Sequence, residues 1–208
     1  MAERLGGRLI LEEYGKTALG AIAKRTPNTV HGIAANVWNR IVFKRWNSVD
    51  PQQLAPYFRQ SDPTLHLAIS DVIGNEVIRD IYYVRGWKGS KKPSRLAVEL
   101  LVAHVYRNDL QLGDVTFRNP DQPIPPAARR FSDQTHRGFG LLPILMENLI
   151  KKAREHHCEQ VTLTAARRDQ VPMFGHHGFR VEDTASGQAA MRLGYGIPME
   201  RDVEAFRA

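Results

Sequence analysis

The chain has 208 residues, 42% of them hydrophobic, and its formal net charge of +7 comes from 29 lysines and arginines against 22 aspartates and glutamates. This length supports one well-buried core and no composition shift marks a boundary, so we expect a single domain over residues 1–208. No apolar run approaches the roughly 20 residues that cross a bilayer and no signal-like segment follows Met1, which predicts a cytoplasmic protein without a membrane partner.

The N-terminal part of the sequence predicts one strand and two helices. Residues 8–12 suit a first strand, and residues 17–25 suit a short helix that ends before Pro27. From Val30 to Val42 apolar residues recur at three- and four-residue steps, which predicts an amphipathic helix.

Three strands are predicted next, over residues 65–69, 76–84 and 95–106. The third is also apolar enough over residues 96–105 to form a buried helix, so both interpretations stay open. Residues 107–136 then form a long insert that contains four prolines and two adjacent arginines. Long irregular segments beside a site often carry function, so this insert is a candidate acceptor-binding flap, with an idle surface loop as the alternative.

A glycine-turned basic loop, a helix and a strand follow in order. Gly138 and Gly140 allow a tight turn whose backbone N–H groups face outward at the start of a helix, where anions bind. Apolar residues from Leu141 to Ala153 recur with helical spacing, and residues 161–164 alternate like a strand. Residues 188–193 are predicted to be a closing strand.

This segment resembles the coenzyme-binding core of the GNAT superfamily of acyl-CoA-dependent N-acyltransferases, specifically over residues 136–180. The family loop reads Gln/Arg-x-x-Gly-x-Gly/Ala; Arg137 and Gly140 match it, whereas Leu142 stands where a small residue is usual. Downstream, residues 173–179 resemble the family's Leu-Tyr-x-x-x-Gly-Phe segment, in which the tyrosine often protonates the departing thiolate. Phe174 occupies that tyrosine position and cannot donate a proton.

The resemblance implies an α/β fold with a mixed, mostly antiparallel central sheet of about six to seven strands flanked by helices. It implies the order strand, two helices, three antiparallel strands, coenzyme helix, strand, helix and two closing strands. It also implies acetyl-CoA as co-substrate and direct transfer of the acetyl group to a primary amine, without an acyl-enzyme. The pyrophosphate would be held by the loop, which consists of Arg137, Gly138, Phe139, Gly140, Leu141 and Leu142.

Amide formation requires a base, because the attacking amine must lose its proton. Glu99 is the first candidate, since a charged residue inside the apolar run over residues 96–102 requires an explanation, and His104 is the second. An outward-facing Glu99 on a half-exposed element is the competing interpretation.

Other features of the sequence exclude little and leave alternatives open. Cys158, the only cysteine, is expected to be a buried or idle thiol, and the adjacent histidine pairs diverge too far on a helix to share an ion, so no metal site is expected. One alternative function is a GNAT-like acyl-CoA-binding module with little turnover, given Phe174 and Leu142. Another is a nucleic-acid-binding protein, because residues 18–29 and the following helix resemble a helix-turn-helix. The acceptor could be a small molecule, a protein or an RNA, and a homodimer is expected by analogy.

Overall fold

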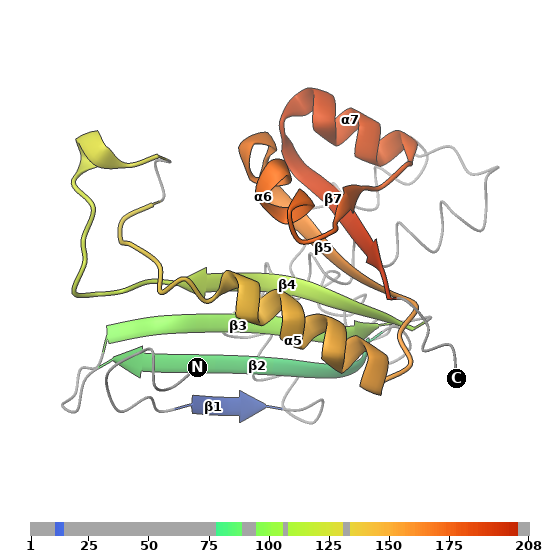
Figure 1. Ribbon diagram of the computed structural model, residues 1–208, viewed down its shortest axis with the longest axis horizontal. Coiled ribbons are helices and arrows are strands. Elements are labelled where there is room, and N and C mark those ends of the chain that lie inside the picture. The colour runs from blue at the N-terminus through green and yellow to red at the C-terminus, as the bar shows by residue number, and fades with distance from the viewer. Residues whose placement is uncertain (1–10, 15–77, 89–94, 106–107, 131–133, 204–208) are drawn as a thin grey trace, which may run out of the picture.

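A computed structural model describes residues 11–14, 78–88, 95–105, 108–130 and 134–203 of the chain. Within these ranges seven strands form one sheet in the order β1-β2-β3-β4-β5-β7-β6 (Figure 1). The helices expected over residues 17–25 and from residue 30, and the strand expected over residues 65–69, lie outside the described residues. The nucleic-acid alternative therefore also concerns residues outside them.

The sheet is mixed, because β4 and β5 run parallel while all its other recorded strand pairs are antiparallel. The strands are β1 (Leu11–Tyr14), β2 (Ile78–Lys88), β3 (Arg95–Val105), β4 (Asp109–Phe117), β5 (Gln160–Arg167), β6 (Arg180–Val181) and β7 (Tyr195–Asp202). The helices are the short 3-10 turns η3 (Pro126–Ala128) and η4 (Arg168–Gln170), and α5 (Leu142–Glu155), α6 (Val171–Gly175) and α7 (Ala185–Leu193). None of these helices is long and apolar enough to cross a membrane.

The three strands that precede α5 are β2, β3 and β4. The strand predicted over residues 95–106 is confirmed as β3, and its helical alternative is wrong. Because side chains on both faces of β3 are buried, its sequence is an almost continuous apolar run. The prediction that residues 107–136 lack regular structure is also wrong, because β4 occupies the first part of this segment. The bulge at Gly113 interrupts the alternation of polar and apolar residues, so the sequence did not predict a strand here.

The closing strand predicted over residues 188–193 is wrong, because these residues belong to α7. Thr184 caps this helix by accepting a hydrogen bond from the backbone N–H of Gly187 at 3.0 Å. Gly194 ends it in the left-handed conformation, with φ of 85°. The N-terminal cap at Thr184 and the C-terminal glycine therefore favour a helix over the strand that the short apolar stretch suggested. The closing strand is β7, which begins directly after Gly194.

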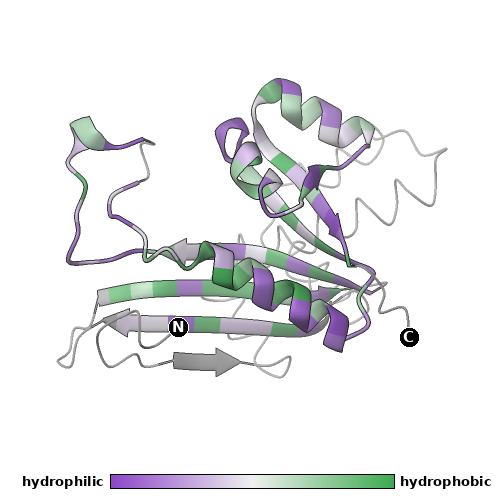
Figure 2. Ribbon diagram, viewed as in Figure 1, coloured by the Kyte–Doolittle hydropathy of each residue, from purple (hydrophilic) through white to green (hydrophobic). Residues whose placement is uncertain are grey.

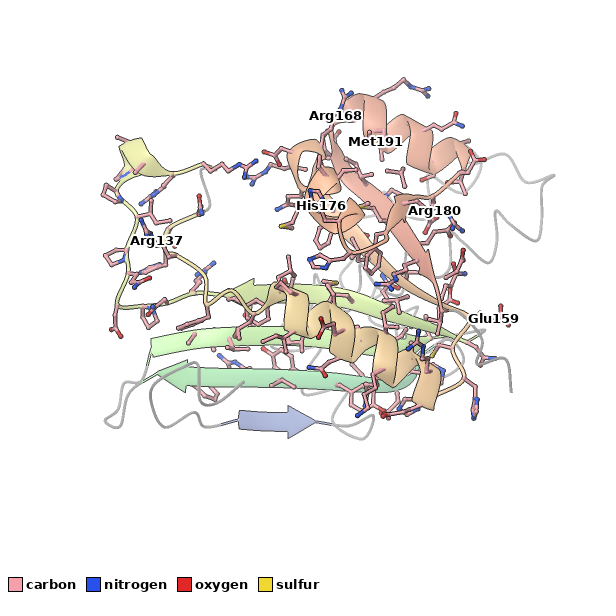
Figure 3. All side chains as sticks on the ribbon, in the orientation of Figure 1. Arg137, Glu159, Arg168, His176, Arg180 and Met191 are labelled. Carbon is pink, nitrogen blue, oxygen red and sulfur yellow. The ribbon has the colours of Figure 1, made fainter. Side chains whose placement is uncertain are left out.

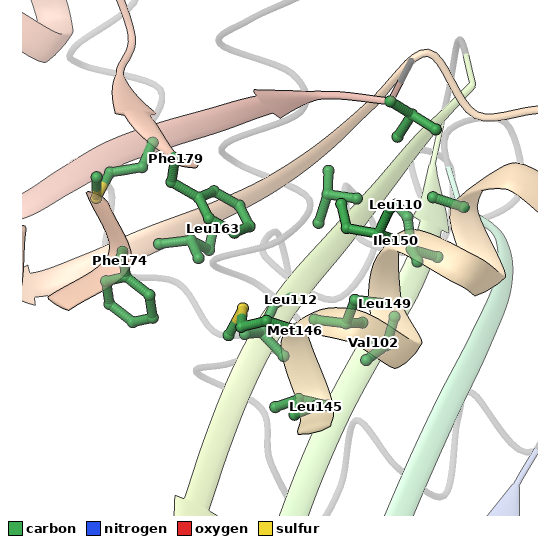
Figure 4. Packing of buried hydrophobic residues seen from close by; sticks show 14 of the residues in the cluster. Val102, Leu110, Leu112, Leu145, Met146, Leu149, Ile150, Leu163, Phe174 and Phe179 are labelled. Carbon is green, nitrogen blue, oxygen red and sulfur yellow. The ribbon is translucent and has the colours of Figure 1, made fainter. Parts of the chain in front are cut away.

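Helix α5 covers one face of the sheet with the predicted apolar stripe, and its polar side faces away (Figures 1 and 2). The stripe packs on side chains from β3, β4 and β5 in the main core cluster (Figure 4). Burying each leucine, isoleucine or methionine side chain of this stripe stabilises the fold by roughly 1.5–3 kcal/mol. Cys158 is buried in the same cluster, as predicted. The stripe consists of Leu145, Met146, Leu149, Ile150 and Ala153.

The first turn of α7 leaves no room for a side chain at Gly187. A Cβ there would lie 2.2 Å from the carbonyl oxygen of Glu182, a backbone atom that cannot move cheaply. We expect Gly187→Ala to lower the free energy of unfolding by about 1–3 kcal/mol. Gly175→Ala is the control, because a Cβ at this glycine meets nothing within 4 Å. Urea denaturation measures both, and equal stability of the two variants would contradict this packing of α7.

Candidate functional site

A β-bulge bends β4 near its middle. The pairing of β3 with β4 passes from Val102↔Leu112 to Leu101↔Asp114, so Gly113 is an extra residue without a partner on β3. Bulges increase local twist and redirect the strand that carries them. The bulge also shifts the alternation of faces, so Val115 packs toward the main core cluster and Asp114 lies on the opposite face.

The parallel pairing of β4 with β5 ends at the same place. Its last pair is Leu112↔Leu163, after which β4 stays paired with β3 and β5 stays paired with β7. The two strands diverge beyond this point (Figure 1). In the part of the chain that the structure describes, the β5-facing edge of residues 113–117 therefore has no strand partner. We call this region the opening.

The glycine loop lies at the end of β4, beside the opening. The carbonyl oxygen of Arg137 accepts a hydrogen bond from the N–H of Asn119 at 2.7 Å, and its N–H donates to Gln122 at 2.9 Å. A Cβ on Gly138 would lie 3.6 Å from the carbonyl oxygen of Phe117. Gly140 has φ of +64°, a conformation that favours glycine.

Helix α5 begins directly after this loop without a side-chain cap. Leu141 occupies the cap position and is 1% exposed, packed in a small cluster with Ala97 and Val98. The backbone N–H groups of the first turn are thus available to an anion, although Pro143 contributes none. Leu142, where the family has a small residue, is half-buried and packs against the main core cluster.

The described remainder of the expected insert, residues 118–130 and 134–136, forms an excursion that we call the arm (Figure 1). Ile124 donates its N–H to Thr135 at 2.9 Å, and Pro123 forms an isolated antiparallel bridge with His136. The arm leaves from the end of β4 and returns at the glycine loop, so it lies beside the opening. Figure 3 shows Arg137 between the two sides of the arm and His176 near α6. Acceptor binding by the arm stays a prediction.

Glu99 lies on the face of the sheet away from α5. It accepts a hydrogen bond from the hydroxyl of Tyr83, and its carboxylate lies 3.7 Å from Nε of Arg85. It is opposite Thr116 on β4, near the end of the sheet that carries the glycine loop. The glutamate in the apolar run is therefore explained by local partners, and its position near the opening still permits a catalytic role.

His104 lies at the other end of β3, opposite Leu110. Its ring centroid is 5.5 Å from that of His156, just beyond the last turn of α5. Nε2 of His156 is 3.5 Å from the hydroxyl of Tyr82, and Lys152 lies 3.8 Å above the Tyr82 ring. The structure does not bring His104 and Glu99 together.

The bulge places another carboxylate, Asp114, beside the opening. Asp114 pairs with Leu101 and lies on the same face as Glu99, two residues along from its partner Thr116. Such diagonal neighbours are about 7–8 Å apart. The sequence did not indicate Asp114 as a candidate base, because no strand was predicted for its segment. The only local signal for such a role is that this aspartate directly follows Gly113 in an alternating stretch.

Phe174, at the position of the family tyrosine, is part of the core rather than of the opening. It is 6% exposed, and its ring centroid lies 6.3 Å from that of Phe179 in an edge-to-face arrangement. Leu163 and Met146 belong to the same cluster (Figure 4). This position therefore supplies no proton to a leaving group.

Charged groups at the β6–β7 edge are paired. The guanidinium of Arg180 lies 2.6 Å from the carboxylate of Asp202 and 3.3 Å from that of Glu200. The hydrogen bond to Asp202 and the negative charges of Asp202 and Glu200 raise the pKa of this guanidinium above its ordinary value. Among the described side chains, no group of three histidine, cysteine, aspartate or glutamate residues could hold a metal ion.

No family profile and no curated protein matches this chain. Solved structures resemble it at low similarity. A nourseothricin acetyltransferase is 17% identical with a TM-score of 0.37, and the match covers 59% of this chain and 65% of that chain. A GNAT-family acetyltransferase from Staphylococcus aureus Mu50 is 10% identical with a TM-score of 0.40, covering 95% of this chain and 100% of that chain. A Bacillus subtilis acetyltransferase in complex with CoA is 13% identical with a TM-score of 0.38, covering 65% and 82% of the two chains.

Likeness of this degree carries no conclusion about activity, so the resemblance is judged on the chain's own elements. Three antiparallel strands precede the glycine loop and α5, and the parallel strand β5 follows them. A helix and the closing strands follow in the order that the sequence resemblance implied, with α7 as an addition between β6 and β7; the two helices expected after the first strand lie outside the described residues. On the order of its elements the chain has a GNAT-like fold, and no sub-family is identified.

Proposed function

We propose that the protein is an acyl-CoA-dependent N-acyltransferase that moves an acetyl group from acetyl-CoA to a primary amine by direct transfer. The observation that carries this proposal is the divergence of β4 from β5 beside an uncapped helix start. A gap between two strands of a sheet gives a linear thioester and an amine a place to meet. The glycine loop and the start of α5 give the same place an anion-binding end.

The described residues fit coenzyme A at two points. Backbone N–H groups of the loop from Arg137 to Leu142 would hold the pyrophosphate, helped by the positive end of the α5 dipole. The open edge of residues 113–117 presents backbone donors and acceptors, which suit the amide groups of a pantetheine arm as an added strand does. Leu142 packs toward the core, which removes the main objection that the sequence raised.

The base is best supplied by a carboxylate at the opening. Asp114 follows the bulge directly, so we place it first for accepting the proton of the attacking amine. Glu99 comes second, because it lies on β3, one strand farther from the divergence of β4 and β5. His104, near the far end of α5, comes third. With Phe174 in the core, the leaving thiolate takes its proton from water or another group. The acceptor is an amine-bearing small molecule, protein or RNA, and a homodimer remains part of the proposal.

The coenzyme site is tested by calorimetric titration with acetyl-CoA. A Cβ on Gly140 meets nothing within 4 Å, so a bulky side chain would occupy the space outside the loop where the pyrophosphate would lie. We expect wild type to bind with micromolar affinity and Gly140→Trp to bind at least about 100-fold more weakly, a difference of roughly 2.7 kcal/mol.

Gly194→Trp is the matched control for this titration. Gly194 also has a positive φ, +85°, and open space around its Cβ, so the variant carries similar backbone strain at the end of α7. It should bind acetyl-CoA like wild type. Equal loss in both variants, or no binding by folded wild type, would contradict the coenzyme site. Binding without any turnover over a panel of primary amines would instead identify an acyl-CoA-binding module.

The base is tested by the release of free thiol from acetyl-CoA in the presence of amine. Removing a general base lowers the rate by about 10²–10⁴-fold, so we expect this loss of kcat in Asp114→Asn, with acetyl-CoA affinity unchanged. Glu99→Gln should lose less activity and more stability, because it breaks the contact with Arg85. Asp109→Asn is the control, since Asp109 begins β4 away from the opening. A larger loss in Glu99→Gln would transfer the role to Glu99.

A further inference from the structure

The arm carries a one-sided set of charges. Its described residues, 118–130 and 134–136, include three arginines and one aspartate, and no lysine or glutamate. The arginines are Arg118, Arg129 and Arg130, of which the first and the last are exposed and Arg129 is half-buried. The arm is therefore a positively charged excursion whose permanent cations are all guanidinium groups.

Hydrogen bonds within the arm hold one of these guanidinium groups in a defined place. The N–H of Gln122 donates to the carbonyl oxygen of Asn119 at 3.0 Å, which closes a turn where the arm begins. Beyond this turn the two sides of the arm pair with each other through Ile124 and Thr135. Nε of Arg129 donates to the carbonyl oxygen of Ile124 at 3.1 Å, and this bond does not use the two Nη groups of the arginine.

The charges of two arm arginines are not neutralised within the described part of the chain. There, no carboxylate forms an ion pair with Arg118 or Arg129, whereas Arg85, Arg167 and Arg180 are each paired with one. Charge-assisted hydrogen bonds from arginine to an anion are about twice as strong as neutral ones. The arm thus presents cations that suit an anionic partner.

The composition of the arm favours a nucleic acid over a protein as that partner. Among the described residues the exposed large hydrophobic side chains are Met173, Leu193 and Tyr195, and all three lie outside the arm. The core of a protein–protein interface is apolar, whereas protein–nucleic acid interfaces are more polar and much more positively charged. The planar fork of arginine also matches phosphate oxygens in pairs, which lysine does not.

The arm extends beyond the place that the coenzyme pyrophosphate would occupy. Arg137 belongs to the glycine loop, and Thr135 lies two residues before it, about 7 Å along an extended chain. Arg129 is bound at this level of the arm, through the carbonyl oxygen of Ile124. A pyrophosphate at the loop does not account for an arginine held there, whereas a polymer with a phosphate at every nucleotide does.

We propose that the arm binds the phosphodiester backbone of an RNA that carries the acceptor amine. The proposal deepens the acyltransferase function and rests on it for the role of the RNA as acceptor. Base amines are conjugated with their rings and are weak nucleophiles. The reacting amine is therefore an aliphatic group attached to the RNA, of the kind that an amino acid esterified to its 3′ end supplies. Because the arm lies beside the opening, an RNA held on the arm brings this amine to it.

The transfer itself needs no further reactant. The amine nitrogen forms an amide bond with the carbonyl carbon of the acetyl group, and the C–S bond of the thioester breaks. The amine loses one proton and the departing thiolate gains one, so the products are the acetylated RNA and free coenzyme A.

RNA binding is tested by fluorescence anisotropy of a labelled mixture of deacylated transfer RNAs with the full-length protein, over a series of salt concentrations. We expect Arg118→Gln/Arg129→Gln to weaken binding by at least about tenfold. Each lost phosphate contact should also lower the slope of log affinity against log salt by roughly 0.7–0.9. Arg118→Lys/Arg129→Lys keeps both charges and should keep most of this slope.

Arg154→Gln/Arg192→Gln is the matched control, because it removes the same charge from exposed positions in the last turns of α5 and α7. It should bind RNA more tightly than the arm variant. No binding of RNA by folded wild type, an equal loss in the control, or an equal affinity for polyglutamate would overturn the proposal. So would an equally large loss of slope in the lysine variant.

The coenzyme phosphates are the competing ligand for these arginines, and a second titration separates the two. We expect Arg118→Gln/Arg129→Gln to bind acetyl-CoA like wild type, and saturating acetyl-CoA to leave the RNA bound. Weaker acetyl-CoA binding in this variant, or displacement of the RNA by acetyl-CoA, would assign the arginines to the coenzyme and overturn the proposal.

The role of the RNA as acceptor is tested by transfer of a radiolabelled acetyl group. The label should enter a mixture of aminoacylated transfer RNAs and not the deacylated mixture. If acetyl-CoA binds and small amines are acetylated but neither RNA is, the RNA proposal fails and the proposed function stands. If RNA binds and acetyl-CoA does not, the proposed function fails, and with it the role of the RNA as acceptor.

Discussion

The bulge at Gly113 is the constraint on which the rest of this structure depends. By adding one residue to β4, it ends the parallel pairing with β5 and turns the strand away from its neighbour. The same residue reverses the alternation of faces, which brings Val115 under α5 and Asp114 to the opposite side. Without the bulge the sheet would continue as a closed surface, and no position in it would be reachable from both faces.

The core holds this opening in place. Helix α5 packs on both diverging strands, with Leu110 and Leu112 on one side and Val161 and Leu163 on the other. Phe174 joins the same cluster beside Phe179, so the position at which relatives carry a proton donor contributes packing here. In the proposed reaction, such a rigid wedge between strands would hold two substrates in a fixed geometry.

The two faces of the sheet divide the chemistry between them. Loop and helix N–H groups on the α5 side suit an anion, and the carboxylates of Asp114 and Glu99 lie on the other side. A substrate pair with one phosphate-bearing partner and one amine matches this division.

Local pattern in the sequence was sufficient for α5, β5 and the glycine loop, because one-sided burial imposes a helical or alternating period on neighbouring residues. It also identified Phe174 and Leu142 as departures from the GNAT family pattern, but it did not show where their side chains pack. It failed for β4, whose pattern a bulge interrupts, and for α7, where the caps outweigh a short apolar run. Only the tertiary structure decided which side chains contact Glu99 and how far His104 lies from it. It also decided that Gln111 pairs with Thr162. Strand register joins residues tens of positions apart, and no local period in the sequence carries that information.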